Sequence, residues 1–309
     1  MATRVVNSAF DDAALTVSDM VKDPTWIPQQ IAEALDGSFI EDLVFRNGGT
    51  NDGVVAFREM ASPFLSSDAE NVAEFAEIPV ADPMLGDVKS IVGKKVALAI
   101  RVSREMQRFN KIDQVQLRMQ ALVRTMVKNS VAASIKALDS ADIATAAASK
   151  AWGQADADPM KDIFDGIEAI QGAKATTVDN AYFGYEPDLI LAHPTVITKL
   201  IRNEKVQKLF IGDVAHDNPL YKGLKNIQIA GLDVATTRFM PANSLYILER
   251  GTAGFVSDAD PLTITDLYEE GGSSGQGGPR QTWRADAFQN RIVGVDNPKA
   301  IFKLTGING

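Results

Sequence analysis

The longest regular pattern of apolar residues lies in the middle of the chain, at residues 110–138. Apolar side chains recur there every three or four positions, which is the period of one buried face of an α-helix. Such a helix would be about 40 Å long, which is unusual for a globular domain. Length alone also fits a core helix of an α/β enzyme, so the segments on either side must decide its meaning.

The region before this helix carries patterns typical of β-strands, in which large apolar residues alternate with small or polar ones. The predicted strands are 54–58, 75–80 and, most regular of the three, 96–103 (VALAIRVS). The run 47–53 (NGGTNDG) predicts a loop. The first 47 residues carry only short helical signals, of which 28–43 is the clearest, broken by prolines and by Gly37.

After residue 138 helical and strand patterns are mixed, beginning with an Ala-rich stretch of little information. The predicted helices are 160–171, 195–201 and 204–210, and the predicted strands are 189–192, 227–234, 245–248, 262–268, 283–295 and 300–304. A Gly- and Ser-rich segment, 271–279, predicts a surface loop. No repeat of fixed period is visible.

Composition narrows the classes of function. The chain is 45% hydrophobic and 23% charged, as in ordinary globular proteins, and no apolar run approaches a membrane span. The first seven residues lack the apolar core of a secretory signal, and the absence of Cys fits assembly in a reducing cytoplasm. A net charge of −9 argues against a dedicated nucleic-acid binder, although not against a container whose wall faces DNA.

Candidate catalytic residues are few. Of the two histidines, His193 lies between a predicted strand and a proline, which favours a structural capping role over catalysis. His216 lies in a polar loop with Asp213 and Asp217; one imidazole with loop carboxylates could ligate a cation, but a solvated loop is the favoured interpretation. No Gly-x-Ser-x-Gly motif is present to hold a nucleophile.

The nearest approach to a phosphate-binding loop, residues 86–95 (GDVKSIVGKK), fails twice. Its first glycine is two residues too far from the Gly-Lys pair, and Lys95 replaces the Ser or Thr that would hold magnesium. Carboxylates are plentiful, so a carboxylate-site hydrolase stays open, but no pair is marked as special. The sequence therefore predicts no catalytic, cofactor or metal site.

Taken in order, several segments resemble the Hong Kong 97-like major capsid protein family of tailed bacteriophages along nearly the whole chain. The strand ending in 101–105 (RVSRE) leads into the long helix, called the spine helix in that family. The remaining resemblance is carried by 187–194 (PDLILAHP), 231–234 (GLDV), 283–295 (WRADAFQNRIVGV) and 298–305 (PKAIFKLT). Each motif is weak alone, and their order and spacing make the resemblance.

The resemblance implies an α+β fold and a structural protein without enzymatic activity or cofactor. It implies an N-terminal arm (1–47), an extended two-stranded loop (48–96), a peripheral domain with the spine helix (97–139 and 246–299) and an axial domain (140–245 and 300–309). The chain would assemble into pentamers and hexamers of an icosahedral head, because head-to-tail contacts between identical subunits close into rings. An isolated two-stranded loop is marginal in water, so a neighbouring subunit is its natural partner.

Partners follow from the same resemblance. The chain before the spine helix leaves no room for a fused scaffolding domain, so we expect a separate scaffolding protein or none. A portal, possible decoration proteins and packaged double-stranded DNA, bound only non-specifically, complete a virion assembled in the cytoplasm of a bacterial host, without a membrane.

Some family members form Lys–Asn isopeptide links between subunits. Only Lys89, Lys94 or Lys95 with Asn290 or Asn297 would pair by region. No specific motif supports such a link, and ordinary solvated lysines are the favoured interpretation.

Three alternatives remain. An encapsulin, a nanocompartment that loads enzymes, should present an N-terminal helix and a cargo-peptide groove, whereas the N-terminal region here predicts a broken, polar arm. A cytosolic hydrolase with a carboxylate site is the alternative from another class. A tail-tube or decoration protein fits the strands but leaves the long helix unexplained.

Overall fold

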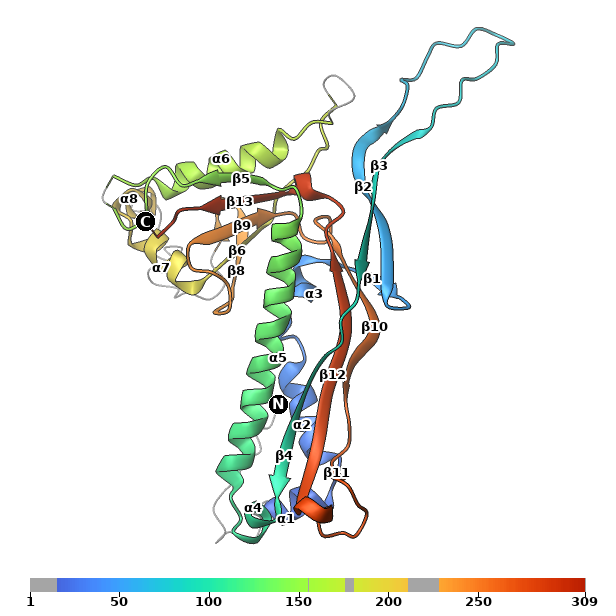
Figure 1. Ribbon diagram of the computed structural model, residues 1–309. Coiled ribbons are helices and arrows are strands. Elements are labelled where there is room, and N and C mark those ends of the chain that lie inside the picture. The colour runs from blue at the N-terminus through green and yellow to red at the C-terminus, as the bar shows by residue number, and fades with distance from the viewer. Residues whose placement is uncertain (1–15, 155, 176–180, 211–227, 309) are drawn as a thin grey trace.

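The computed structural model describes residues 16–154, 156–175, 181–210 and 228–308. The described part is elongated: a long helix runs beside a long sheet, a second sheet with its helices lies at one end, and a two-stranded hairpin projects beyond both (Figure 1). Within the described residues no helix is long and apolar enough to cross a membrane.

The long sheet is organised around one strand, β12 (Thr282–Gly294). One half of β12 pairs antiparallel with β4, so that Thr282 lies opposite Ser103. Its other edge pairs antiparallel with β10 and with the short β11, and β10 in turn pairs parallel with β1. The bounds are β1 Arg46–Thr50, β4 Val96–Ser103, β10 Phe255–Ile264 and β11 Tyr268–Glu269.

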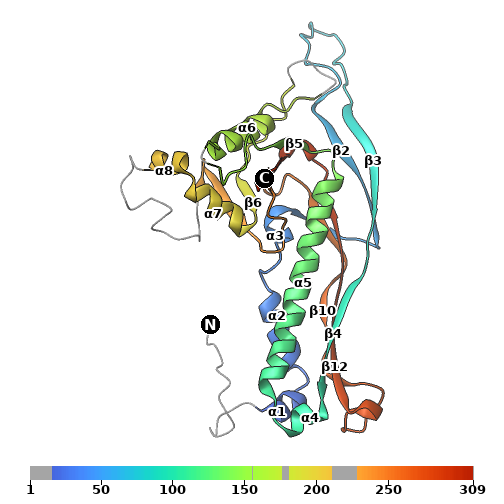
Figure 2. The same cartoon turned by 60° about the vertical axis from the view of Figure 1, so that its left-hand side comes forward.

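The long helix is α5 (Ile112–Ser140), which confirms the helix predicted from the apolar period. Its first half buries Val115, Leu122 and Met126 against β4, β12 and the N-terminal helices. Those helices are α1 Val17–Lys22, α2 Trp26–Leu35 and α3 Glu41–Val44, while α4 (Arg104–Arg108) forms the turn into α5. Figure 2 shows α2 lying along α5 and α1 at the foot of α5, beside α4. Because a long helix is stabilised mainly by packing of its apolar face, this contact accounts for its length.

The N-terminal region is therefore not the broken, polar arm that the sequence predicted, at least from residue 16 onward. Ile27, Ile31 and Leu35 are buried in the same core as the first half of α5. A capping box between Thr16 and Asp19 starts α1, and Gly37, at φ +64°, separates α2 from α3. The proline and glycine breaks divide the segment into short helices, and its apolar residues still find a common face.

The second sheet has six strands in the order β5-β13-β9-β6-β8-β7. Its central strands β6 and β9 are fully buried, and α6 and α7 pack their apolar faces on the same core. The strands are β5 Ala144–Ala147, β6 Leu189–Ala192, β7 Gln228–Ile229, β8 Leu232–Thr236, β9 Ser244–Leu248 and β13 Ile301–Thr305. The helices are α6 Pro159–Gln171, α7 Pro194–Arg202 and α8 Glu204–Phe210. As expected, the C-terminal strand returns to this sheet.

The chain passes between the two sheets three times, through residues 141–143, 249–254 and 295–300. A core cluster with members from both sheets and from α5, including Leu138, Val293 and Ile301, fills this junction. The strand β9 pairs along its whole length with β6 and β13. The expected domain boundary between residues 245 and 246 would divide this one strand.

Three local predictions were wrong. Residues 47–53 were expected to form a loop, but Arg46–Thr50 is strand β1, in which Gly48 lets the backbone approach β10: a Cβ there would lie 3.0 Å from the carbonyl oxygen of Val256. The expected strand 75–80 is irregular and exposed. The expected strand 262–268 begins earlier, at Phe255, and ends at Ile264. Pairing with distant strands decided the first and third of these.

Candidate assembly surfaces

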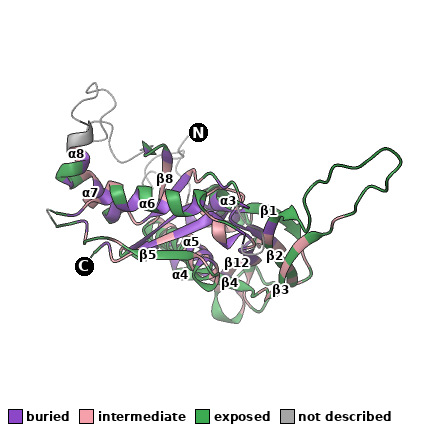
Figure 3. Ribbon diagram, turned by 90° about the horizontal axis from the view of Figure 1, so that it is seen from above, coloured by how far each residue is buried: buried purple, intermediate pink, exposed green. Residues whose placement is uncertain are grey.

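The hairpin consists of β2 (Val54–Leu65), β3 (Pro83–Val92) and the connecting residues 66–82. It is a two-stranded antiparallel sheet of its own. Seen from above, most of it is exposed (Figure 3). Both faces carry large apolar side chains in solvent, among them Leu85 and Val88 at 62% and 59% exposure. The hairpin thus has no core of its own.

Contacts at its base fix where the hairpin leaves the body. Phe57 packs edge-on against Phe255 of β10, with ring centroids 5.2 Å apart. The backbone N–H of Met60 donates to the carbonyl oxygen of Asp296 at 3.1 Å, and Arg46 forms an ion pair with the Asp296 carboxylate. The far end of the hairpin is consequently held in position by a supported base and not by packing along its length.

The connecting residues combine negative charge with exposed apolar side chains. Residues 66–82 contain five carboxylates and no Lys or Arg. Phe75, Ile78 and Val80 are 97%, 76% and 92% exposed. A contiguous exposed apolar surface rimmed by polar groups is typical of an interaction site.

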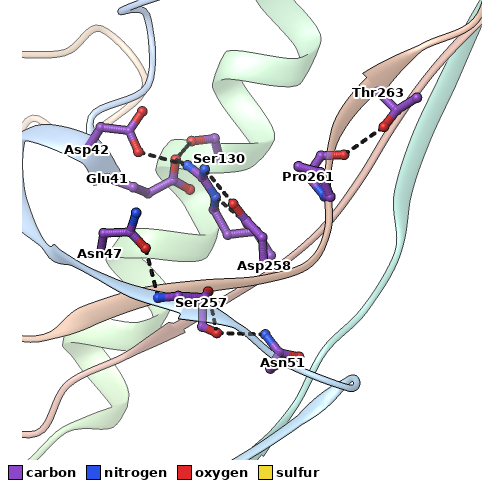
Figure 4. A network of polar contacts seen from close by, with 11 residues as sticks. Glu41, Asp42, Asn47, Asn51, Ser130, Ser257, Asp258, Pro261 and Thr263 are labelled. Atoms are coloured by element: carbon purple, nitrogen blue, oxygen red, sulfur yellow. Dashed lines mark hydrogen bonds and ion pairs between the residues drawn. The ribbon is translucent and has the colours of Figure 1, made fainter.

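A polar cluster connects three parts of the body (Figure 4). Arg291 of β12 donates from Nε and Nη2 to the two carboxylate oxygens of Asp258 at 2.7 and 2.9 Å, and from Nη1 to Asp42 at 3.0 Å. Glu41 lies 3.6 Å from Nη1 of Arg291 and accepts a hydrogen bond from the Ser130 hydroxyl of α5. The cluster ties the N-terminal helices to α5 and to the long sheet.

Burial governs the charges of this cluster. Glu41 is 2% exposed, and burial raises the pKa of its carboxyl, although the Ser130 hydroxyl and the Arg291 guanidinium oppose that rise. Burial lowers the pKa of Arg291. The hydrogen bonds and negative charge of Asp258, together with the charges of Asp42 and Glu41, raise it by more, so the pKa is raised overall and the guanidinium stays charged. A fixed cation next to several carboxylates makes a rigid clamp and not a proton-transfer site.

A groove of about 520 Å³ lies beside this cluster, between α2 and the long sheet. Ala32, Leu262 and Ile264 supply apolar walls, and Gln289 lines the groove with a buried Nε2 that has no hydrogen-bond partner. A buried donor without an acceptor is costly. Sequence reasoning missed this groove and Glu41, because their walls and partners come from segments far apart in the chain.

Most of the residues considered for a covalent link make contacts with other residues of the same chain. Lys89 pairs with Glu59 across the hairpin, and Lys95 lies with its Nζ 4.0 Å from the centre of the Phe288 ring. Asn297 is buried: its Nδ2 donates to the carbonyl oxygen of Thr252 at 2.7 Å. The remaining two candidates are Lys94 and Asn290; the buried Oδ1 of Asn290 has no hydrogen-bond partner and faces Gly93.

The candidate catalytic residues do not converge. His193 is the N-cap residue of α7, where its Nδ1 accepts a hydrogen bond from the backbone N–H of Thr195 at 3.2 Å. Asp213, His216 and Asp217 lie outside the described residues. Residues 86–95 form most of β3 and the turn after it, not a loop that opens a helix. In the described part of the chain no three His, Asp or Glu side chains gather as metal ligands.

A long helix along a long sheet, a compact second sheet and a projecting hairpin define the class: this is the Hong Kong 97-like fold of shell-forming capsid proteins. Solved structures with this arrangement are similar over most of their length. A virus-like particle from Pyrococcus furiosus matches with a TM-score of 0.56 at 13% identity, over 90% of this chain and 97% of that one. The capsid of a native GTA particle matches with 0.58 at 13%, over 87% and 89%. Mycobacterium phage Bobi matches with 0.53 at 12%, over 99% and 95%.

The family follows from the sequence itself. The family model described as phage capsid protein matches residues 86–304, which is more than two thirds of the chain. The chain belongs to the phage capsid protein family, and it is a structural protein of the capsid shell. No curated protein sequence matches it.

Proposed function

We propose that this chain is the major capsid protein of a tailed bacteriophage, which assembles into pentamers and hexamers and encloses double-stranded DNA in an icosahedral head. The observation that carries the proposal is the hairpin. It exposes apolar residues on both faces, and a two-stranded sheet without a covered face is marginal in water. A neighbouring copy of the chain supplies the missing cover, and repeated head-to-tail contacts of this kind close rings.

The two sheets suggest how the chain lies in such a ring. The six-stranded sheet with α6, α7 and α8 would form the axial domain near the ring centre. The long sheet with α5 would form the peripheral domain, and the hairpin would be the extended loop. The boundary proposed here keeps the whole of β9 in the axial domain.

The remaining partners belong to the same proposal. A separate scaffolding protein, or none, would guide assembly in the cytoplasm of the bacterial host, and a portal would occupy one vertex. Decoration proteins would bind outside where they exist. The net charge of −9 supports DNA contacts that are weak and non-specific.

The test is expression of the chain alone and with the proteins of its genome neighbourhood, followed by sedimentation and negative-stain electron microscopy. Closed shells or capsomer-sized rings are the expected result. A homogeneous small oligomer at every salt and protein concentration would refute the proposal and would favour the hydrolase alternative, for which the carboxylates would then be mutated in turn.

One observation favours the encapsulin alternative. The N-terminal helices are packed on α5, and a groove with an unsatisfied Gln289 amide lies beside α2, whereas the expectation of a polar arm had counted against that class. Particle contents separate the two: DNA-filled shells of large diameter support the phage head, while small shells that hold an enzyme support the nanocompartment.

A further inference from the structure

Two surfaces at opposite ends of the molecule each carry an exposed aromatic side chain. Negative charges surround the first, and mainly positive charges surround the second. The first, the tip, comprises residues 72–80 at the far end of the hairpin. The second, the corner, comprises residues 104–118, which include α4 and the start of α5. Figures 1 and 2 place the tip and the corner at opposite ends of the elongated chain, so one chain cannot bring its own tip to its own corner.

The tip is strained as well as exposed. Phe75 has a φ of +69° and is 97% exposed. A bulky residue in the left-handed region is uncommon, and such strain persists where the conformation serves a function. Glu74 and Glu77 lie within two residues of this ring. An aromatic side chain held out in water, on a strained backbone between carboxylates, is suited to a partner that is apolar and cationic.

The corner has the complementary chemistry. Phe109 ends α4 and is 63% exposed, and the cationic groups of Arg108 and Lys111 lie 5.8 and 5.9 Å from the centre of its ring. Leu117, on the second turn of α5, is 64% exposed. The corner holds four basic residues, Arg104, Arg108, Lys111 and Arg118, against the two acidic residues Glu105 and Asp113.

We propose that the tip of one chain docks on the corner of a second copy, with Phe75 and its apolar neighbours against Phe109 and Leu117, and with Glu74 and Glu77 facing Arg108 and Lys111. This inference rests on the proposed self-assembly and names the contact that directs it. The opposed charges fix which surfaces meet, because like charges brought together across an interface are strongly unfavourable. The contact is head to tail, so each chain uses one tip and one corner.

The experiment reverses the charges on each surface separately and then together. The tip variant is E74K/E77K, the corner variant is R108E/K111E, and the combined variant carries all four changes. The control matched to the corner variant is R124E/K128E, which makes the same change of charge as R108E/K111E on exposed positions in the middle of α5. Assembly is measured by sedimentation over a series of protein concentrations, and folding by the thermal melt of the unassembled chain.

Each single-surface variant should need a protein concentration for assembly that is at least about a hundredfold higher than the control, with an unchanged melt. The combined variant should come within about tenfold of the wild type, because the reversed tip again meets a surface of opposite charge. Recovery by the combined variant also shows that neither single-surface variant failed merely by misfolding.

A substitution at the tip tests the apolar part independently. Phe75→Gly removes the exposed ring and suits the positive φ, so the melt of the unassembled chain should not fall while the concentration needed for assembly rises. Two results would overturn the tip–corner contact alone, provided that the wild-type chain forms shells. Either the single-surface variants assemble at the same concentration as the control, or the combined variant needs as high a concentration as the single-surface variants. A wild-type chain that forms neither shell nor ring would refute the proposed function as well.

Discussion

Replacing Arg291 by Met removes the cation of the polar cluster and keeps most of the side-chain volume. Asp258 loses two charge-assisted hydrogen bonds, Asp42 loses one, and Glu41 remains buried without a nearby positive charge. Breaking a buried ion pair costs about 3–5 kcal/mol. The Asp258 and Asp42 side chains are 22% and 52% exposed, so water replaces part of what is lost. We therefore expect a loss of about 2–4 kcal/mol in the free energy of unfolding at pH 7.

The stability difference between the Arg291 variant and the wild type should depend on pH, in a direction set by the pKa of Glu41. The pKa of Glu41 is raised above its ordinary value of 4.5 in the folded chain, so the folded chain binds this proton more tightly than the unfolded chain does. The contribution of Glu41 to stability is therefore greatest below pH 4.5 and is lost as the pH rises through the folded pKa. Removing Arg291 raises that pKa further, so the difference between variant and wild type should shrink as the pH falls from 7 towards 4.5.

The assay is denaturant unfolding of the unassembled chain at several pH values. Glu41→Gln in the Arg291→Met background removes the stranded charge and should recover about 1–2 kcal/mol. Arg280→Met is the matched control, because the Arg280 side chain is 70% exposed and makes only a 3.6 Å contact with Glu270. A loss below about 1 kcal/mol in the Arg291 variant, or no recovery with Gln, would refute the argument that Arg291 neutralises a buried carboxylate.

Three further predictions concern other parts of the chain. Gly254→Ala should lower stability by about 1–3 kcal/mol, because a Cβ there would lie 2.3 Å from a backbone oxygen of β12, whereas Gly153→Ala, with no atom within 4 Å, should change little in the same denaturant assay. Trp152→Phe should cost about 1–3 kcal/mol, because the buried Asp162 loses the hydrogen bond from the Trp152 Nε1 at 2.9 Å; equal stability of the two chains would contradict this. A Glu-specific protease should cut residues 66–82 rapidly in the unassembled chain and slowly in shells. Equal cleavage rates in the two states would contradict the burial of this segment on assembly.

The parts of the fold that could be predicted from sequence are those whose burial follows a simple period. Strand β4 has the predicted bounds, and α5 and β12 differ from prediction by one or two residues at each end, because the apolar residues of each recur at the period of its own kind of element. Strand β1 could not be predicted: Arg46–Thr50 contains Gly48 and Gly49, and its conformation depends on pairing with β10, more than 200 residues away.

The candidate surfaces also differ in whether a sequence pattern marks them. The alternating residues 75–80 resemble a half-buried strand, yet the chain itself does not cover them; on the proposed function, that pattern belongs to a contact with another copy. Glu41 carried no signal at all, since a carboxylate near the end of a polar segment is ordinary until Ser130 and Arg291 are seen beside it. Periodicity describes neighbours along an element and says nothing about partners brought in from elsewhere.

The three passages of chain between the two sheets all lie at one junction, where Glu249 donates its backbone N–H to the carbonyl oxygen of Ala300 and Asn297 donates to Thr252. A small rotation at this junction would move the far end of α5 by the largest distance, as at a hinge. The 29 residues of α5 give an arm of about 43 Å, so a rotation of about 5° there would move the far end by about 4 Å. On the proposed assembly, identical chains would fit rings of different size by adjusting the three short connectors together with the core cluster packed between the two sheets.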